Sequence, residues 1–407
     1  MSINNGMACY GCRICETLCP VNAIKFKKNS RGFMYPEVDR EACIECGICE
    51  RNCGLVSETR VKNSPIEFYA LKTKDKDIKK KSSSGGVFSL LAKEIFSQNG
   101  VVYGCLLDEN QNAVYGRAEK WDECIPFMGS KYVQSDMGNI VEAVLEDLKK
   151  GRIVLFTGTP CECLGIKTAA ANIKSTGVLV TCDFYCHGSP SPMIFDDFKK
   201  YMEEKHGGKI ISFVFRDKEK VVKPPSSRGI RIKMLCGEQE KDIYDAKSND
   251  KYYELFKFNY ILRESCYECP CIGFDRDTDI TLGDYWGCEK FHPEFFDREG
   301  ISLVSVNTLL GADYFAKIKD KAECISIERE QIRQPMLNKP PQRKQNYDQV
   351  WETYYSKGFD EAATLCVNSN RLSMPIRLKI RILELIPVLW LAKLREIRKT
   401  VKKQKGM

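Results

Sequence analysis

Two short runs near the start of the chain hold eight of its 21 cysteines. CYGCRICETLCP covers residues 9–20, CIECGICERNCG covers residues 43–54, and each has the spacing C-x2-C-x2-C-x3-C. Three closely spaced thiolates wrap one corner of an iron–sulfur cubane, and a short helix carries the fourth cysteine to a second cubane. The spacing therefore predicts two [4Fe–4S] clusters. The predicted ligands are Cys9, Cys12, Cys15 and Cys53 for the first cluster, and Cys43, Cys46, Cys49 and Cys19 for the second.

This arrangement is typical of bacterial two-cluster ferredoxins. The alternative is a zinc ribbon, but zinc ribbons use paired C-x2-C units rather than triplets with a trailing cysteine. Gly54 replaces the proline that would follow the second run, which affects the turn and not the ligands. We predict that residues 1–57 form a ferredoxin domain, with small strands after Asn22 and in GFMYPEVD.

Four later cysteines follow predicted strands or turns. They are Cys161 in GTPC, Cys186 in YCHG, and Cys266 and Cys269 in RESCYECP. Ligands of open α/β sheets collect at the carboxyl ends of strands, so four thiolates at such positions suit a third [4Fe–4S] cluster. The alternative is that they are ordinary core residues, since buried cysteine is common. The C-x2-C pair, flanked by arginine and an aromatic residue, favours ligands.

The middle of the chain alternates between predicted helices and strands. Helices are expected at about 85–98 and 141–150 and in CECLGIKTAA, and strands in VVYGCLLD, RIVLFT and GVLVTCDF. This order predicts an α/β domain over roughly residues 80–200, and the strands predicted within 209–308 add an α+β portion that shares its core. The polar stretch after Ser57, which ends in KTKDKDIKKKSSSGG, is interpreted as a linker with an exposed segment before the first helix.

Several segments together resemble the family of coenzyme F420 hydrogenase/dehydrogenase beta subunits. They are SSGGVFSLLAKEIF, GSKYVQSDMG, VLFTGTPCECLGIK, CHGSPSP and RESCYECPCIGFDRDTDITLGDYWG, which lie within roughly residues 67–310. The resemblance implies a flavin, FAD (or FMN), beside an iron–sulfur cluster, with a ferredoxin module as a common partner domain. It also implies that the cluster ligands are Cys161, Cys186, Cys266 and Cys269.

The chain departs from the family pattern near these ligands. Glu162 and Cys163 stand where glutamine and an apolar residue are expected, and Cys182 and Cys271 also lie close in sequence. One of the extra cysteines could therefore replace a named ligand.

Other residues are candidates for the flavin site. Ser83, Ser84, Gly85 and Gly86 open a predicted helix, whose free N–H groups and dipole favour a phosphate. The alternative is simple helix capping by serine. Further candidates are Lys131 and Tyr132, Gly158 and Thr159 in the GTPC turn, and Asp284 and Trp286 in GDYWG. The alternatives there are an ordinary surface pair for Lys131 and Tyr132 and structural roles for Asp284 and Trp286. His187, beside Cys186, is the candidate catalytic proton donor.

A flavin together with iron–sulfur clusters joins a two-electron reaction to one-electron transfer. We predict an iron–sulfur flavin-dependent oxidoreductase, either a ferredoxin-linked reductase of a small molecule or an enzyme that oxidises reduced coenzyme F420. The alternative is a non-catalytic electron-transfer subunit of a larger hydrogenase or dehydrogenase. The expected partners are a small-molecule substrate and an electron donor or acceptor protein, such as ferredoxin or a dehydrogenase subunit.

Composition and charge restrict the location and the partners. The start of the chain has no apolar signal region, and its longest apolar run, Leu385–Ala392, is too short to span a bilayer, so we expect a cytoplasmic protein. Eleven Lys or Arg and two Glu follow from Arg371 to the end, against a net charge of +8 for the whole chain. The body is thus nearly neutral, and no nucleic-acid partner is expected.

The predicted fold class is α+β (mixed α/β), with a ferredoxin-like domain at 1–57, an α/β flavin-binding domain at 67–310 and a helical region at 311–407. In residues 376–405, apolar side chains such as Trp390 and Leu394 recur at steps of three and four beside basic residues. This pattern suits peripheral docking on an anionic inner membrane face or on a partner protein. The alternative is a helix packed on its own domain with a solvated basic tail.

Overall fold

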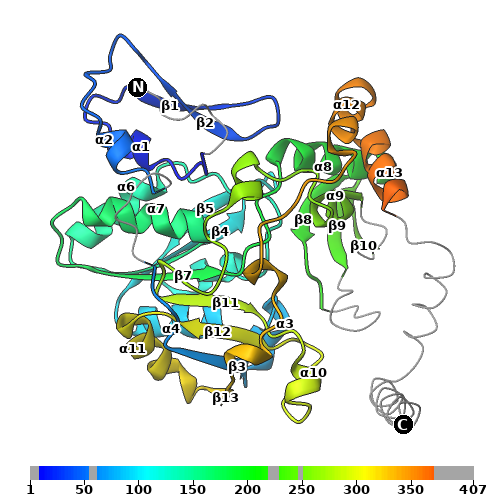
Figure 1. Cartoon of the computed structure of the whole chain (residues 1–407). Helices are drawn as coiled ribbons and strands as arrows, with labels where there is room; N and C mark the ends of the chain where they lie inside the picture. The colour runs from blue at the N-terminus through cyan, green and yellow to red at the C-terminus, as the bar shows by residue number, and fades with distance from the viewer. Residues whose placement is uncertain (1–8, 55–61, 219–228, 246–250, 371–407) are drawn as a thin grey trace, which may run out of the picture.

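The computed structural model describes residues 9–54, 62–218, 229–245 and 251–370, and its largest feature is an eight-stranded sheet (Figure 1). The strand order is β13-β3-β12-β11-β7-β6-β4-β5. The four neighbours β11, β7, β6 and β4 are parallel, and the outer strands are antiparallel. The strands are β3 (Glu67–Thr73), β4 (Val101–Leu107), β5 (Ala113–Ala118), β6 (Ile153–Thr157), β7 (Val178–Phe184), β11 (Ile280–Asp284), β12 (Ser302–Val306) and β13 (Ala322–Ser326). The predicted mixed α/β architecture is confirmed.

Helices cover both faces of this sheet. They are α4 (Val87–Ser97) and α11 (Leu309–Lys319) on one face, and α6 (Ile140–Lys149) and α7 (Pro160–Ala171) on the other. Successive strand residues point to opposite faces, so Val102 and Leu155 pack toward α4 and α11, whereas Val101, Val154 and Phe156 pack toward α6 and α7. The sheet continues past residue 310, because β13 pairs with β3.

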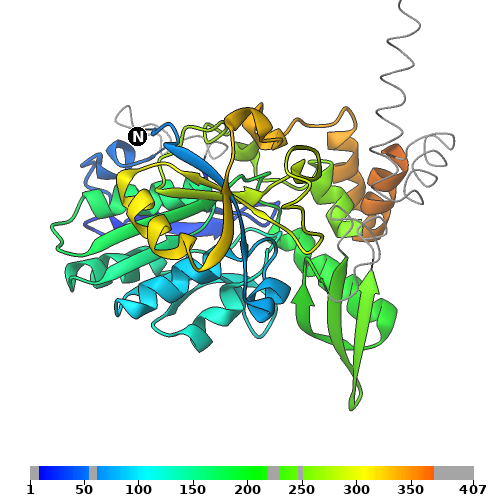
Figure 2. The same cartoon turned by 90° about the horizontal axis from the view of Figure 1, so that it is seen from below.

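A second, antiparallel sheet lies beside the first (Figure 2). Its strands are β8 (Lys209–Val214), β9 (Ile230–Cys236) and β10 (Gln239–Asp245), packed with α8 (Pro192–His206), α9 (Lys251–Lys257), α12 (Tyr347–Lys357) and α13 (Phe359–Ser369). Aromatic rings such as Phe195, Phe213 and Tyr252 fill its core. The α+β portion predicted within 209–308 is therefore divided, with β8 and β9 here and β11 and β12 in the large sheet.

The predicted linker after Ser57 is wrong for residues 67–81. EFYALKT forms β3, which lies between β12 and β13, with Ala70 and Leu71 fully buried. Four of the six lysines in KTKDKDIKKK belong to the short helix α3 (Lys76–Lys81), whose N-terminal N–H groups are capped by the Asp75 carboxylate. The short apolar stretch in EFYALKT forms an internal strand, and both of its neighbours come from distant parts of the chain.

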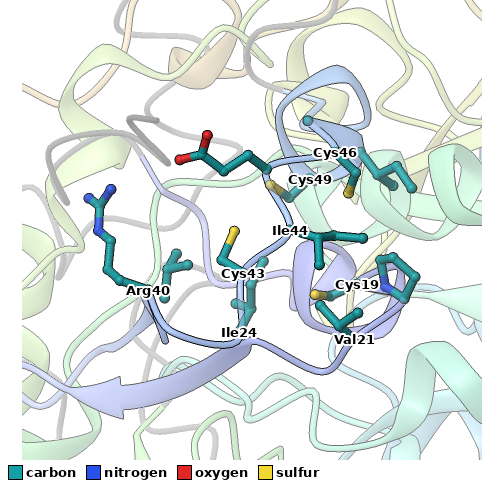
Figure 3. A pocket seen from close by; sticks show the side chains of 13 residues that line it. Cys19, Val21, Ile24, Arg40, Cys43, Ile44, Cys46 and Cys49 are labelled. Atoms are coloured by element: carbon teal, nitrogen blue, oxygen red, sulfur yellow. The ribbon is translucent and has the colours of Figure 1, made fainter.

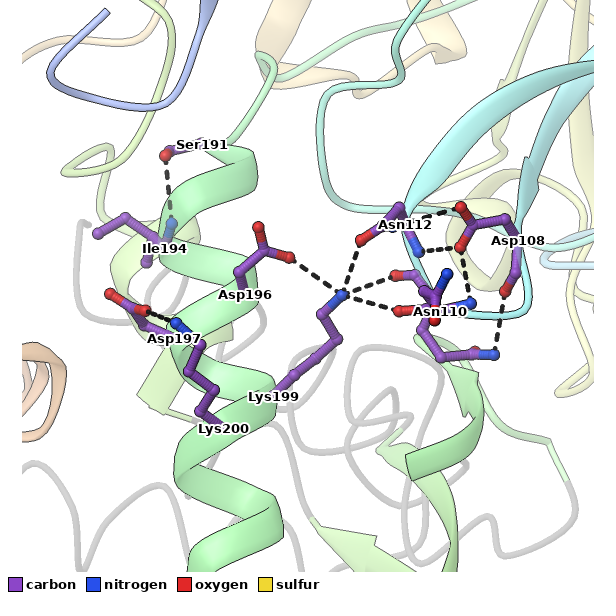
Figure 4. Close-up of polar contacts among 10 residues, drawn as sticks. Asp108, Asn110, Asn112, Ser191, Ile194, Asp196, Asp197, Lys199 and Lys200 are labelled. Atoms are coloured by element: carbon purple, nitrogen blue, oxygen red, sulfur yellow. Dashed lines mark hydrogen bonds and ion pairs between the residues drawn. The ribbon is translucent and has the colours of Figure 1, made fainter. Parts of the chain in front are cut away.

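Lys199 on α8 forms hydrogen bonds that connect the helices of the small sheet to the large sheet (Figure 4). Its ammonium group donates to the carbonyl oxygen of Asn110 and to Asn112 Oδ1, both at 3.0 Å, in the loop between β4 and β5. It also pairs with Asp196 at 3.0 Å. The segment around Cys186 connects β7 of the large sheet to α8 of the smaller unit, so both units position it.

The N-terminal cysteine runs form a compact module over α6 and α7 (Figure 1). It contains α1 (Ile14–Thr17), an antiparallel hairpin of β1 (Ile24–Lys28) and β2 (Met34–Val38), and α2 (Ile48–Arg51). The remaining short helices are α5 (Trp121–Cys124) and α10 (Cys288–Phe291). No helix within the described ranges is long and apolar enough to cross a membrane. The amphipathic segment predicted at 376–405 lies outside the described residues.

Candidate iron–sulfur and flavin sites

The two N-terminal cysteine runs form loops with the same backbone turns. Gly11 and Arg13 have φ angles of 78° and 59°, and Glu45 and Gly47, at the equivalent positions of the second run, have φ angles of 54° and 68°. These left-handed residues bend each loop ahead of its short helix. The Gly11 N–H donates to Cys9 Sγ at 3.3 Å, a type of hydrogen bond that also tunes iron–sulfur clusters.

One hollow, of about 570 Å³, lies against the second loop (Figure 3). Its cysteines are Cys19, Cys43, Cys46 and Cys49, the four predicted for one cluster. Val21 and Ile44 contribute apolar side chains to its wall, which also includes Arg40 and Glu45. The Ala23 N–H donates to Cys19 Sγ at 3.3 Å. The fold therefore brings Cys19 from the first run to the three cysteines of the second.

A second hollow, of about 730 Å³, lies between the module and α7. It is lined by Cys9, Cys12, Cys15 and Cys53, the four cysteines predicted for the other cluster, and also by Cys49 and Cys161. Gly165 on α7 allows the close approach, since a Cβ there would lie 2.7 Å from Ile14 Cδ1 and 3.0 Å from Cys12 Cβ. A cysteine of the α/β body thus reaches the wall of a ferredoxin hollow. The ligand assignments remain predictions.

The donor sets in these hollows fit iron–sulfur clusters. Burial raises the pKa of Cys12 to about 12, and burial with the nearby Cys12 and Cys9 thiols also raises the pKa of Cys15. Thiols so crowded resist ionisation unless a metal binds them as thiolates. Over the described residues, no three His, Cys, Asp or Glu side chains converge as the ligands of a single metal ion would. A cubane differs, because each of its four irons takes its own thiolate.

The third predicted ligand set forms where parallel strands end. Cys161 lies in the first turn of α7 directly after β6, and Cys186 follows β7. Burial and then the neighbouring Cys266 thiol raise the pKa of Cys186, so the segment carrying Cys266 reaches the same place. The Ser189 N–H donates to Cys266 Sγ at 3.3 Å, and Thr159 Oγ1 lies 3.1 Å from Cys161 Sγ.

The fourth ligand of this set has two candidates. Cys266 lies in the 3-10 helix Glu264–Glu268, and Cys269 caps its C-terminus. Side chains three positions apart in such a helix lie on the same side, which favours Cys269. Cys271 is only 4% exposed, and its thiol, after burial, helps to raise the pKa of Cys266. Proximity therefore favours Cys271, and spacing favours Cys269.

The other departures from the family pattern have structural explanations. Glu162 forms a capping box with Thr159 at the start of α7, and its carboxylate accepts a 2.8 Å hydrogen bond from the Tyr115 hydroxyl. Cys163 is fully buried and Cys182 is 3% exposed. Gly158 is required locally, because a Cβ there would lie 2.3 Å from the Tyr115 hydroxyl oxygen. Local contacts with Glu162 and Tyr115 therefore account for the conformation of the GTPC turn.

The glycines of the predicted phosphate-binding segment are explained by packing. A Cβ on Gly85 would lie 2.1 Å from the Leu71 carbonyl oxygen and 2.6 Å from the Ser302 nitrogen. Gly86 is the N-cap of α4, with a φ angle of 91°. Both glycines are therefore needed without any phosphate. Ser83 remains near the helix start, with its Oγ 2.8 Å from Ser130 Oγ. The phosphate role remains a prediction.

The structure brings two other flavin candidates, Lys131 and Tyr132, close to this segment. Ser130, which Ser83 contacts, precedes Lys131 and Tyr132. The Lys131 ammonium donates to two carbonyl oxygens, and burial lowers its pKa to about 8. The Tyr132 ring stacks on Phe256 at a centroid distance of 5.2 Å. Lys131 is thus part of the loop's own structure, and Tyr132 lies in an aromatic cluster.

Two basic residues at the end of β8 were missed by sequence reasoning. Arg216 pairs with Asp284 at 2.8 Å, and Lys218 donates to the Ser84 carbonyl oxygen at 3.0 Å. They join the Ser83–Gly86 segment to the carboxyl end of β11. The signal was present in FVFRDK, where two cations directly follow a strand, but only the tertiary structure shows what they meet.

Trp286, a candidate for the flavin site, and His187, the candidate proton donor, differ in their exposure to solvent. Trp286, just after β11, is 46% exposed and is available to a ligand or partner. The His187 ring lies 5.0 Å from Phe256 in an edge-on contact, and burial lowers the pKa of this imidazole. A neutral, buried imidazole is poorly suited to donate a proton at neutral pH, unless the site is opened to water.

Comparison with known proteins agrees with this arrangement. Residues 151–331 match the family described as the C terminus of the coenzyme F420 hydrogenase/dehydrogenase beta subunit, and residues 8–54 match the 4Fe-4S dicluster domain. The resemblance to the F420 hydrogenase/dehydrogenase beta subunits is confirmed. The chain is thus an iron–sulfur protein related to these beta subunits.

Individual relatives cover different parts of the chain. The F subunit of F(420)H(2) dehydrogenase from Methanosarcina mazei is 24% identical over 77% of this chain and 83% of its own length. The ferredoxin-type protein NapF of Haemophilus influenzae is 45% identical over 10% of this chain and 24% of its own length. A chain of the F420-reducing [NiFe] hydrogenase complex from Methanosarcina barkeri has a TM-score of 0.42 and 14% identity, covering 74% of this chain and 91% of that one.

Proposed function

We propose that this chain is an iron–sulfur flavoprotein that connects one-electron transfer to a two-electron reaction. The N-terminal module would hold two [4Fe–4S] clusters through the ligand sets predicted above. Cys161, Cys186, Cys266 and Cys269 would hold a third, with Cys271 as the alternative fourth ligand. A bound flavin would supply the change between single electrons and a hydride.

The observation that carries this proposal is the shared wall of the second hollow. Cys161 lines it together with Cys9, Cys12, Cys15 and Cys53. Electron transfer needs short separations, and here a proposed ligand of the third cluster lies beside the four proposed ligands of a ferredoxin cluster. The carboxyl edge of the sheet then leads from Cys186 to Asp284 and Trp286 after β11, where the flavin and the substrate are proposed to bind.

The residues of this edge define the proposed flavin site. Arg216 and Lys218 place two cations between Asp284 and Ser84, which suits the anionic parts of a flavin nucleotide. The two-electron partner is proposed to be reduced coenzyme F420 or another small molecule. The relation to the F subunit of F(420)H(2) dehydrogenase supports the first choice.

Iron, acid-labile sulfide and flavin should be measured on the same anaerobically purified sample. About twelve irons and one flavin per chain are expected. About eight irons with one flavin would remove the third cluster and leave the flavin proposal standing. If the protein binds no flavin, even after incubation with FAD or FMN, the proposed two-electron reaction at a flavin is contradicted.

A second candidate function is that of an electron-transfer subunit without a substrate of its own. The observation in its favour is that the Methanosarcina mazei relative is named as a subunit of a dehydrogenase. The isolated chain would then exchange electrons with ferredoxin or viologen dyes but would not oxidise reduced F420. Anaerobic assays of both reactions on the isolated chain separate the two functions.

A further inference from the structure

Arg263 is the largest fully buried side chain among the described residues, with 1% exposed. Its backbone belongs to the α/β body, where its N–H donates to the Ser189 carbonyl oxygen and its carbonyl oxygen accepts from the Cys266 N–H, both at 2.9 Å. Its guanidinium reaches the N-terminal module. The side chain therefore crosses the junction between two proposed cluster sites.

The contacts of the guanidinium are made with neutral groups. Nε donates to the Cys9 carbonyl oxygen at 2.6 Å, and Nη2 donates to the Met34 carbonyl oxygen at 2.8 Å. Nη1 donates to Gln134 Oε1 at 3.0 Å, and the guanidinium lies 4.2 Å from the centre of the Tyr35 ring. Within the described ranges, no Asp or Glu side chain forms an ion pair with it.

A buried cation without a counter-charge is costly, so its position calls for a negative partner. Glu162 lies within the range of its field, but burial raises the pKa of that carboxyl, which is already bound to Tyr115. A [4Fe–4S] cluster with four thiolates carries net negative charge, and each reduction adds one more. Arg263 is fixed to the carbonyl group of Cys9 on one side and precedes Cys266 by three residues on the other.

We propose that Arg263 is the shared counter-ion of the two clusters that meet at this junction. It would stabilise the reduced state of the cluster at Cys9, Cys12, Cys15 and Cys53, and that of the third cluster. Its positive charge would thus raise both reduction potentials and ease the passage of an electron between them. Its effect on the third cluster rests on the function proposed above, whereas its effect on the ferredoxin cluster does not.

The test is a redox titration of the full chain, followed by electron paramagnetic resonance, with iron content as the control. Arg263→Gln removes the charge and keeps hydrogen-bonding capacity. We expect it to lower the ratio of reduced to oxidised cluster at the wild-type midpoint about tenfold for each neighbouring cluster, equivalent to about 59 mV for a one-electron couple. Arg263→Lys keeps the charge and should restore both midpoints.

Arg13 provides a matched control. It lines the same hollow, but its guanidinium pairs with Glu16 at 2.7 Å and with Asp136 at 3.0 Å. Arg13→Gln should change the same ratio by less than about threefold, because its charge is already balanced. Equal shifts in Arg13→Gln and Arg263→Gln would overturn the specific role of Arg263.

The other outcomes are also decisive. Unchanged midpoints in Arg263→Gln with full iron content would show that Arg263 only fastens the module, and would refute the proposal. If Arg263→Gln loses iron, Arg263→Lys becomes the deciding variant. A tenfold lower ratio of reduced to oxidised cluster in Arg263→Lys with full iron content would refute a charge effect, because lysine keeps the charge. A wild-type content of about eight irons would remove the third cluster, while the ferredoxin cluster would still test Arg263.

Discussion

The ferredoxin module and the carboxyl edge of the large sheet gather cysteines in opposite ways. In the module, two short runs supply all eight predicted ligands, and equivalent positions in both runs adopt the same left-handed turns. At the sheet edge, Cys161, Cys186 and Cys266 come from three segments that only the parallel strands and the RESCYECP loop bring together. Ligand spacing alone is therefore strong evidence in the first region and weak evidence in the second.

The largest expected effect comes from breaking the exchange of cysteines within the module. Cys53→Ala removes the ligand that the second run is predicted to give to the first cluster. We expect a loss of about four irons per chain and at least a 100-fold slower passage of electrons from ferredoxin to the proposed flavin. Iron analysis and stopped-flow reduction measure both.

The control for that variant is Cys324→Ala on β13, a half-buried cysteine far along the sheet. It should keep the wild-type iron content. Full iron content in Cys53→Ala would contradict the crossed ligand assignment.

The next prediction concerns the fourth ligand at the sheet edge. We expect Cys269→Ala to lose about four irons, because Cys269 caps the 3-10 helix Glu264–Glu268 three positions after Cys266, whereas Cys271→Ala should keep them. The reverse result would transfer the ligand role to Cys271, which proximity favours. Equal iron content in both variants and in the wild type would show that neither is a ligand.

A moderate effect is expected from Arg216. Arg216→Gln removes the ion pair with Asp284, and we expect about tenfold weaker flavin binding with unchanged iron content. The matched control is Arg117→Gln, which breaks the 2.7 Å pair with Asp147 elsewhere on the sheet. Fluorescence titration of the flavin-free protein measures the affinity. Equal losses in both variants would indicate a general loss of stability instead.

The last prediction is a pH dependence of stability that arises from one buried carboxyl of the α/β body. Asp183 on β7 is 1% exposed, and burial raises the pKa of its carboxyl to about 6 from a usual value of 3.8. The folded state thus binds this proton more tightly than the unfolded state. Stability falls as the pH rises from about 4 to about 6, by about 3 kcal/mol at most.

Asp183→Asn removes that ionisation, so its melting temperature should exceed the wild-type value by a few degrees at pH 7 and match it near pH 4. Anaerobic thermal melts across this range provide the measurement. A variant less stable than the wild type at pH 7 would show that the ionised carboxylate is held by favourable partners.

Much of the fold followed from local patterns. The helix α4, the strands β4, β6 and β7 and the turn before Cys161 were predicted near their observed bounds, because apolar periodicity and turn residues act locally. β3 was mistaken for a linker, since its flanking lysines outweighed one short apolar stretch. A central strand is decided by neighbours distant in the sequence, and no local pattern contains them.

The sequence by itself indicated the cysteine ligands and the related family of this protein. Cysteine type and spacing predicted the clusters, and the ordered motifs predicted the relation to the F420 hydrogenase/dehydrogenase beta subunits, because ligand number and local turns are properties of short segments. Only the tertiary structure decided how these parts meet. It placed Cys161 on the wall of a ferredoxin hollow, joined Arg216 to Asp284 and buried Arg263 across the junction. These contacts join residues far apart along the chain, so packing between elements, and not propensity within them, selects them.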